Sequence, residues 1–207
     1  MVAIIDYDAG NIKSVEKAVA ALGKEVTVTR NAEEILSADH VILPGVGAFG
    51  DAMEKLRSYE LEAVIKKVVD KKVPFLGICL GLQLLFESSE ESEGVKGLGL
   101  LPGKIVRIPA DDDLKIPHIG WNSLSYPNKG RLFKGIPEHS YVYFVHSYYL
   151  KAKDAEIVTA ATEYGVSIHA SVEKDNIFAC QFHPEKSSDV GMKILSNFLS
   201  IDRREGY

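Results

Sequence analysis

Cys79 has the surroundings of an enzyme nucleophile. It stands at the centre of Gly77-Ile78-Cys79-Leu80-Gly81, with an apolar strand-like run before it and an apolar helix-like run after it. Such a strand–turn–helix presents its central residue at a tight turn whose flanking positions must lack bulk. At a helix start, free N–H groups and the helix dipole favour a thiolate, and the N–H of Leu80 would point at a developing oxyanion. The alternative is a core cysteine whose glycines only permit close packing, but the paired glycines favour the nucleophile.

A cysteine nucleophile needs a base and a group that orients the base. Of the six histidines, only His183 has a carboxylate placed to serve it locally, in His183-Pro184-Glu185. Side chains two residues apart share a face of an extended segment, and Pro184 favours an extended conformation at His183. The segment follows an apolar run, so it should emerge at the edge of a sheet where α/β sites gather. We therefore predict the triad Cys79, His183 and Glu185.

Two other segments are candidates for the same site. Gln83 lies one helical turn after Cys79, where either a bound polar substrate or a neighbouring loop would satisfy its amide. The segment Gly45–Gly50 matches the G-x-G-x-x-G dinucleotide fingerprint, but Cys79 stands where the ribose-binding acid should follow. We expect the Val46–Gly47 turn to supply a second oxyanion donor instead, because glycine lets backbone N–H groups approach closely. His146 is either a satisfied histidine at a strand end or part of a pocket.

The pattern of apolar residues predicts an α/β fold. In the first half, buried strands alternate with amphipathic helices, as in a parallel sheet covered on both faces. The expected strands are Val2–Tyr7, Glu25–Thr29, His40–Leu43 and Val73–Ile78, and the expected helices are Asn11–Leu22, Phe49–Leu56, Leu61–Val69 and Leu80–Phe86. In the second half, turn residues separate successive strands, which indicates antiparallel additions before a last helix at Val190–Leu199. These strands are Lys104–Ile108, Trp121–Tyr126, Tyr141–Leu150, Glu156–Glu163, Ser167–Glu173 and Ile177–Phe182. The acidic segment Glu87–Glu93 is expected to be a solvated loop.

Length, charge and composition exclude several classes of protein for this chain. The 207 residues suit one domain, 1–207, with a single mixed sheet, and the net charge of −5 argues against a nucleic-acid surface. The longest apolar stretch, Val73–Phe86, is shorter than the roughly 20 residues that span a membrane. No basic leader precedes the first strand, so we expect a cytoplasmic protein. Cys79 and Cys180 are too few for a disulfide scaffold or a zinc cluster, we interpret Cys180 as structural, and we expect no metal and no cofactor.

Together these motifs resemble the class I, triad-type glutamine amidotransferases, which implies a flavodoxin-like fold. The residues that carry the resemblance are Pro44-Gly45-Val46-Gly47, Gly77–Gln83 and His183-Pro184-Glu185. Within this family the sequence is most similar to the glutaminase subunits of imidazole glycerol phosphate synthase, from histidine biosynthesis. That finer resemblance rests on Asp6–Asn11, Leu43–Phe49, Pro117–Asn122, Tyr143–Tyr148 and Lys186–Ser188.

The resemblance implies a reaction and a set of roles. Cys79 would attack the side-chain amide of glutamine, His183 would move the proton, and Glu185 would orient the imidazole. The N–H groups of Leu80 and of the Val46–Gly47 turn would hold the oxyanion. Glutamine would be bound by Gln83 and, by family analogy, by Glu91, His146, Ser147 and Tyr148.

The resemblance also implies a partner, because a free glutaminase would waste glutamine. The expected partner is a (β/α)₈-barrel cyclase subunit that consumes the ammonia and makes imidazole glycerol phosphate and aminoimidazole carboxamide ribonucleotide. Trp121, the only tryptophan, is our candidate for the interface, with a core position as the alternative, and Asn11 is a weaker candidate. Three other functions stay open: a stand-alone cysteine hydrolase of γ-glutamyl amides, the amidotransferase subunit of another synthase, and a non-catalytic module.

Overall fold

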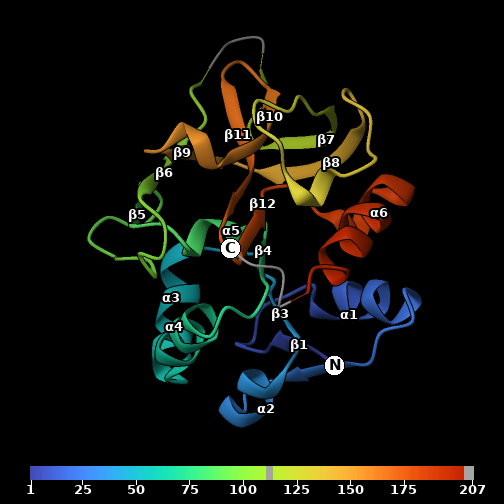
Figure 1. Ribbon diagram of the computed structural model, residues 1–207. Helices are drawn as coiled ribbons and strands as arrows, with labels where there is room; N and C mark the ends of the chain where they lie inside the picture. The colour runs from blue at the N-terminus through green and yellow to red at the C-terminus, as the bar shows by residue number, and fades with distance from the viewer. Residues whose placement is uncertain (111–113, 203–207) are drawn as a thin grey trace.

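Five parallel strands form the half of the main sheet that carries Cys79. The computed structural model describes residues 1–110 and 114–202. The main sheet runs in the order β2-β1-β3-β4-β12-β11-β9-β6-β5, and its first five strands are parallel neighbours. Their bounds are β1 Val2–Ile5, β2 Val26–Thr29, β3 His40–Leu43, β4 Phe75–Ile78 and β12 Ile177–Cys180. The mixed α/β fold is thus confirmed. The last strand was expected to be an antiparallel addition, and β12 is indeed antiparallel to β11, but it lies parallel to its other neighbour, β4 (Figure 1).

Helices cover both faces of the parallel strands, as the alternation of β1 requires. Ala3 and Ile5 face one apolar cluster with α2, α3, α4 and α5, whereas Val2 and Ile4 face a second cluster with α1 and α6 (Figure 1). The helices are α1 Ile12–Ala21, α2 Ala32–Ser37, α3 Phe49–Ser58, α4 Leu61–Asp70, α5 Leu80–Leu84 and α6 Ser188–Leu199. The sequence analysis missed α2, although Asn31 caps it by accepting hydrogen bonds from the Glu33 and Glu34 amides.

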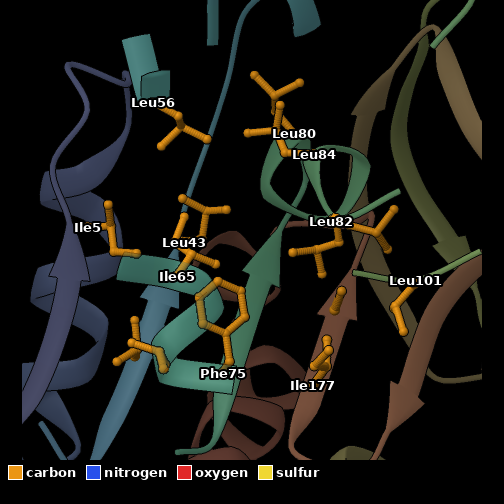
Figure 2. Close-up of a cluster of buried hydrophobic side chains, with 14 of the residues drawn as sticks. Ile5, Leu43, Leu56, Ile65, Phe75, Leu80, Leu82, Leu84, Leu101 and Ile177 are labelled. Carbon is orange, nitrogen blue, oxygen red and sulfur yellow. The ribbon is translucent and has the colours of Figure 1, made fainter. Parts of the chain in front are cut away.

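The short helix α5 is anchored by its leucines. Figure 2 shows Leu80, Leu82 and Leu84 in the same apolar cluster as Leu43 and Phe75 of the sheet. The helix ends at Leu84, two residues before the predicted end. Because isolated helices of this length are unstable in water, packing rather than helix propensity holds the chain that follows Cys79.

The second half adds antiparallel strands and a separate ribbon. Strands β6, β9 and β11 extend the main sheet, β10 pairs with β11, and β7 and β8 form a two-stranded sheet of their own. The bounds are β5 Ser88–Ser89, β6 Gly103–Arg107, β7 His118–Ser123, β8 Tyr141–His146, β9 Tyr148–Ala152, β10 Val158–Glu163 and β11 Ser167–Lys174. Short 3₁₀ turns occupy Arg131–Phe133, Ala155–Ile157 and Pro184–Lys186.

One predicted strand in this half is interrupted. The expected strand Tyr141–Leu150 breaks at Ser147, and its two parts pair in different sheets, β8 with β7 and β9 with β6. The expected solvated loop Glu87–Glu93 is confirmed for most of its length, since Glu87, Glu90 and Glu93 are exposed, but it includes the two-residue strand β5, whose Ser89 is buried. Among the described residues, no helix is long and apolar enough to cross a bilayer.

Candidate active site

Cys79 stands at a strained turn between β4 and α5. Its φ of 54° and ψ of −109° lie in a region that residues with a side chain rarely adopt. The glycines permit the turn: a methyl group on Gly81 would collide with the carbonyl oxygen of Leu43, and one on Gly77 would lie 2.7 Å from the carbonyl oxygen of Gly81. The predicted need for small residues on both sides of Cys79 therefore has a direct steric cause.

His183 and Glu185 form a buried pair. His183 Nδ1 lies 2.7 Å from Glu185 Oε1, and the two side chains are 1% and 0% exposed. The contact was predicted, and His183 is extended as Pro184 led us to expect, with a φ of −100° and a ψ of 96°. The extended segment does not continue to Glu185, because Pro184–Lys186 form a 3₁₀ turn. Proline suits the first position of a helical turn, where its missing N–H has no acceptor to serve.

The charge state of His183 depends on its two neighbours. Burial lowers the pKa of this imidazole, but Cys79 and Glu185 outweigh burial and raise the pKa to about 9. Because Nδ1 is occupied by Glu185, Nε2 is the nitrogen left for the thiol, and it makes no well-formed hydrogen bond with any described residue. Catalytic hydrogen bonds are commonly long before substrate binds. The arrangement suits a thiolate beside an imidazolium.

Polar contacts from distant segments hold this pair. Asn11 Nδ2 donates to Glu185 Oε1 at 2.5 Å, so the residue predicted for the interface also contacts the predicted triad. Ser187 Oγ donates to the His183 carbonyl oxygen and accepts from the Tyr143 N–H, and the His183 N–H donates to the Tyr143 carbonyl oxygen. The His183–Glu185 pair is thereby held by contacts with the start of α1 and with β8.

A cavity of about 310 Å³ opens in front of Cys79. Pro117 and Val145 contribute to its wall. The remaining lining residues include every residue predicted for the oxyanion site and for glutamine binding: Val46, Gly47, Leu80, Gln83, Glu91, His146, Ser147 and Tyr148. The break between β8 and β9 brings the last three to the cavity, since it turns the chain from one sheet to the other.

Several of these lining groups have partners within the chain. Gln83 Nε2 donates to the Tyr148 carbonyl oxygen and to Gln181 Oε1, both at 3.1 Å. Glu91 Oε2 accepts from the Phe49 N–H at 2.8 Å, where α3 begins. The sequence analysis missed Gln181, whose Nε2 lies 3.7 Å from Cys79 Sγ. Its signal was a polar residue between Cys180 and Phe182 in an otherwise apolar run.

One of the predicted oxyanion donors, the Leu80 N–H, is already hydrogen-bonded within the chain. The Leu80 N–H donates to the Gly45 carbonyl oxygen at 3.3 Å, and Gly47 has a φ of 105°, in the region that favours glycine. The Leu80 N–H is thus occupied by the glycine-rich turn, and its oxyanion role stays a prediction.

Cys180, the second cysteine, is fully buried, and burial raises the pKa of its thiol, which agrees with the interpretation of Cys180 as a structural residue.

The ribbon β7–β8 presents an apolar face to solvent. Trp121 is 51% exposed, which excludes the core position considered for it. In the ribbon's register, Trp121 pairs with Tyr143 and Ser123 pairs with Tyr141, so the exposed Ile119, Trp121 and Tyr141 share one face.

Comparisons with known proteins agree with this geometry. The family model described as glutamine amidotransferase class-I matches residues 3–201. A protein of Moorella thermoacetica named imidazole glycerol phosphate synthase subunit HisH is 52% identical, over 99% of this chain and 97% of its own. A protein of Methanocaldococcus jannaschii with the same name is 50% identical, over 97% of this chain and 100% of its own.

Solved structures share the fold at low sequence identity. A crystal structure described as a glutamine amidotransferase has a TM-score of 0.75 at 19% identity and covers 96% of this chain and 97% of its own. The glutaminase domain of Trypanosoma brucei CTPS, with bound acivicin, has a TM-score of 0.68 at 15% identity, over 97% of this chain and 94% of its own. From the family match and the relatives at about half identity, the chain belongs to the class I glutamine amidotransferases.

Proposed function

We propose that Cys79, His183 and Glu185 release ammonia from glutamine. The observation that carries this proposal is the turn at Cys79, which opens onto a cavity while a buried His183–Glu185 pair stands beside the sulfur. A nucleophile, a base and an orienting carboxylate are the groups that acyl transfer requires. The family, whose members are amidotransferases, supports the same chemistry.

In the first half-reaction, the Cys79 thiolate forms a bond to the amide carbon of glutamine. The electron pair of the C=O bond moves to oxygen, and backbone N–H groups near Leu80 and Gly47 stabilise the resulting oxyanion. When the intermediate collapses, the C–N bond breaks and the nitrogen leaves as ammonia with the proton carried by His183. Glu185 keeps the imidazolium oriented and balances its charge.

In the second half-reaction, water hydrolyses the thioester. His183 accepts a proton from water as its oxygen bonds to the acyl carbon, and the C–S bond breaks to return the thiolate. The product is glutamate. Gln83, Glu91 and the His146–Tyr148 segment are the proposed contacts for the glutamine substrate, because they line the cavity with Cys79.

The chain provides the glutaminase activity of an imidazole glycerol phosphate synthase. Relatives that carry this subunit's name match along nearly the whole chain and nearly the whole of their own length. The partner is the cyclase subunit, which consumes the ammonia, and the two form a heterodimer. We place the contact on the exposed face of β7–β8, where Trp121 is the anchor residue that such interfaces favour. We also infer that the whole chain acts as one domain and works in the cytoplasm, where its two free thiols would stay reduced.

The test measures glutamate release from glutamine by the chain alone and by the chain with the cyclase subunit and its ribonucleotide ligand. We expect strong stimulation by the liganded partner and a loss of at least roughly 10³-fold in Cys79→Ala, by analogy with other nucleophile deletions. Cys180→Ala is the matched control and should keep the parental rate. Equal rates with and without the partner would indicate an independent hydrolase, and parental activity in Cys79→Ala would overturn the triad.

The interface has its own test. Trp121→Ala should weaken binding of the cyclase subunit by at least roughly tenfold, because truncation removes the largest exposed aromatic group of the face. Binding is measured by titration with the cyclase subunit. Unchanged affinity together with unchanged stimulation would remove Trp121 from the interface.

A further inference from the structure

A chain of hydrogen bonds leads from the wall of the cavity to the sulfur of Cys79, and chemistry fixes its direction. The Tyr148 carbonyl oxygen can only accept, so the atom of Gln83 beside it is the amide nitrogen. The same nitrogen lies 3.1 Å from Gln181, which must therefore present its carbonyl oxygen to Gln83. The amide nitrogen of Gln181 is then the atom that faces Cys79 Sγ, at 3.7 Å.

The other groups near the sulfur leave few hydrogen-bond donors for a thiolate besides the Gln181 amide. Besides His183 and Gln181, the described group at hydrogen-bond distance from Sγ is the Val145 carbonyl oxygen at 4.0 Å, an acceptor that offers nothing to a negative charge. Tyr7 is not a competing donor, because its hydroxyl donates to the Pro44 carbonyl oxygen at 2.7 Å. Helix α5 has only five residues, so its dipole contributes little.

Gln181 is built into the structure rather than placed at a surface. The residue is fully buried, and its backbone N–H donates to the Ala170 carbonyl oxygen at 2.8 Å. An amide in such a site is expensive to bury unless its groups are paired, and Gln83 and Cys79 are its side-chain partners.

We propose that Gln181 is a further catalytic residue, whose side-chain N–H donates to the sulfur of Cys79 and stabilises the thiolate. The proposal rests on the nucleophilic role of Cys79. It assigns Gln83 a second task besides lining the cavity, since Gln83 keeps the carbonyl oxygen of Gln181 away from the sulfur. Neutral Gln181 also leaves the His183 imidazolium as the only positive charge assigned to the thiolate.

The test follows alkylation of Cys79 by iodoacetamide as a function of pH, in a Cys180→Ala background so that one thiol reports. Only the thiolate reacts, so the pH of half-maximal rate measures how well it is stabilised. We expect Gln181→Met to move this midpoint upward by about one pH unit, which is tenfold less thiolate at pH values well below the midpoint. Gln83→Met should move it by less, because Gln181 then loses its orientation but keeps its N–H.

Ser171→Ala is the matched control. Ser171 is a buried polar residue of β11 whose hydroxyl donates to the Ala179 carbonyl oxygen, with no contact to Cys79, so this variant should keep the parental midpoint. Thermal unfolding is followed for every variant. A folded Gln181→Met with the parental midpoint overturns the inference while leaving the triad intact, whereas parental glutaminase activity in Cys79→Ala overturns the triad itself. If Gln181→Met does not fold, Gln181→Asn, which keeps a buried amide but withdraws its N–H from the sulfur by one methylene, must raise the midpoint.

Discussion

The proposed nucleophile, Cys79, and the proposed base, His183, are held in place by different kinds of interaction. Cys79 is held by steric exclusion, because Gly77 and Gly81 pack so closely that no other residue fits. His183 is held by hydrogen bonds with three residues: it donates to the Glu185 carboxylate and to the Tyr143 carbonyl oxygen, and its own carbonyl oxygen accepts from Ser187 Oγ. An added atom at a tightly packed position cannot be accommodated by a small shift, so the backbone around it must move. Removing one hydrogen bond, in contrast, costs only the limited free energy of that bond. Substitutions beside Cys79 should therefore cost the fold, and substitutions around His183 should cost activity in graded steps.

The largest effect is expected for Gly81→Ala. Alanine is a better helix former than glycine, so any loss must come from the collision with the Leu43 carbonyl oxygen. We expect the free energy of unfolding to fall by at least about 3 kcal/mol and glutaminase activity to disappear. Urea unfolding measures the change. Gly94→Ala, at a position with open space around it, is the control and should cost about 1 kcal/mol for its positive φ. A Gly81→Ala protein as stable as its parent would refute the steric account.

Glu185→Gln should break the base without breaking the fold. The amide has the shape of the carboxylate but cannot balance the imidazolium, so kcat should fall by roughly 10³–10⁴, as for the equivalent change in serine triads. The pKa of His183 should also fall from about 9, because one of the two groups that raise it is gone. Activity is measured in the complex with the cyclase subunit, and the pKa by NMR titration. Glu173→Gln, which removes the ion pair with Arg131, serves as the control and should keep kcat.

The same contrast explains what could be predicted from the sequence. The turn at Cys79 was predictable because its requirement, two glycines around a cysteine between a strand and a helix, is local. The His183–Glu185 contact was predicted with the right conformation at His183 but the wrong one from Pro184 onward, since proline is compatible with both an extended segment and a 3₁₀ turn. The break at Ser147 was missed because the apolar run Tyr141–Leu150 continues through it.

The polar contacts could not be predicted in the same way. Asn11 and Glu185 are 174 positions apart, and Gln83 and Gln181 are 98 apart. No periodicity or spacing links residues so distant, and only the topology brings them together. Gln83 and Gln181 each left a signal in the sequence, because a polar residue in an apolar run requires a partner, but the sequence did not say that the two are partners of each other.

The polar region should also respond to pH. A single consistent chain runs from Asn122 Nδ2 to His118 Nε2, from His118 Nδ1 to His146 Nε2, and from His146 Nδ1 to the Tyr148 carbonyl oxygen. Both rings must then be neutral, and burial lowers the pKa of His118 to about 4 and that of His146 to about 3. In the unfolded chain both rings take up protons near pH 6.5.

The contribution of the His118–His146 pair to the free energy of unfolding should therefore be complete above pH 6.5 and be lost as pH falls toward these two pKa values. Allowing for screening, we expect the free energy of unfolding at pH 5 to lie on the order of 2 kcal/mol below its value at pH 7. His183 contributes with the opposite sign: its raised pKa stabilises the fold below pH 6.5, and this contribution is lost as pH rises through about 9. Urea unfolding at several pH values measures the sum. If NMR shows either ring of the His118–His146 pair charged in the folded protein at pH 5, the proposed chain is wrong.

The smallest effect is expected at Asn11, which acts on Glu185 rather than on the substrate. Its φ of 70° suits asparagine, aspartate and glycine, so Asn11→Gly and Asn11→Asp change the side chain without straining the backbone. Loss of the hydrogen bond to Glu185 Oε1 in Asn11→Gly should lower kcat by about tenfold with KM unchanged, the value of one charge-assisted bond. Asn11→Asp should be worse at pH 8 and recover as pH falls, because two carboxylates at hydrogen-bond distance must share a proton. A weaker affinity for the cyclase subunit with unchanged kcat at saturation, and no such pH dependence in the aspartate variant, would instead make Asn11 an interface residue only. His183 and Glu185 would then be held only by contacts within the second half of the chain. Fewer hydrogen bonds would then position the proposed base, and the contrast with the steric exclusion that holds Cys79 would be weaker.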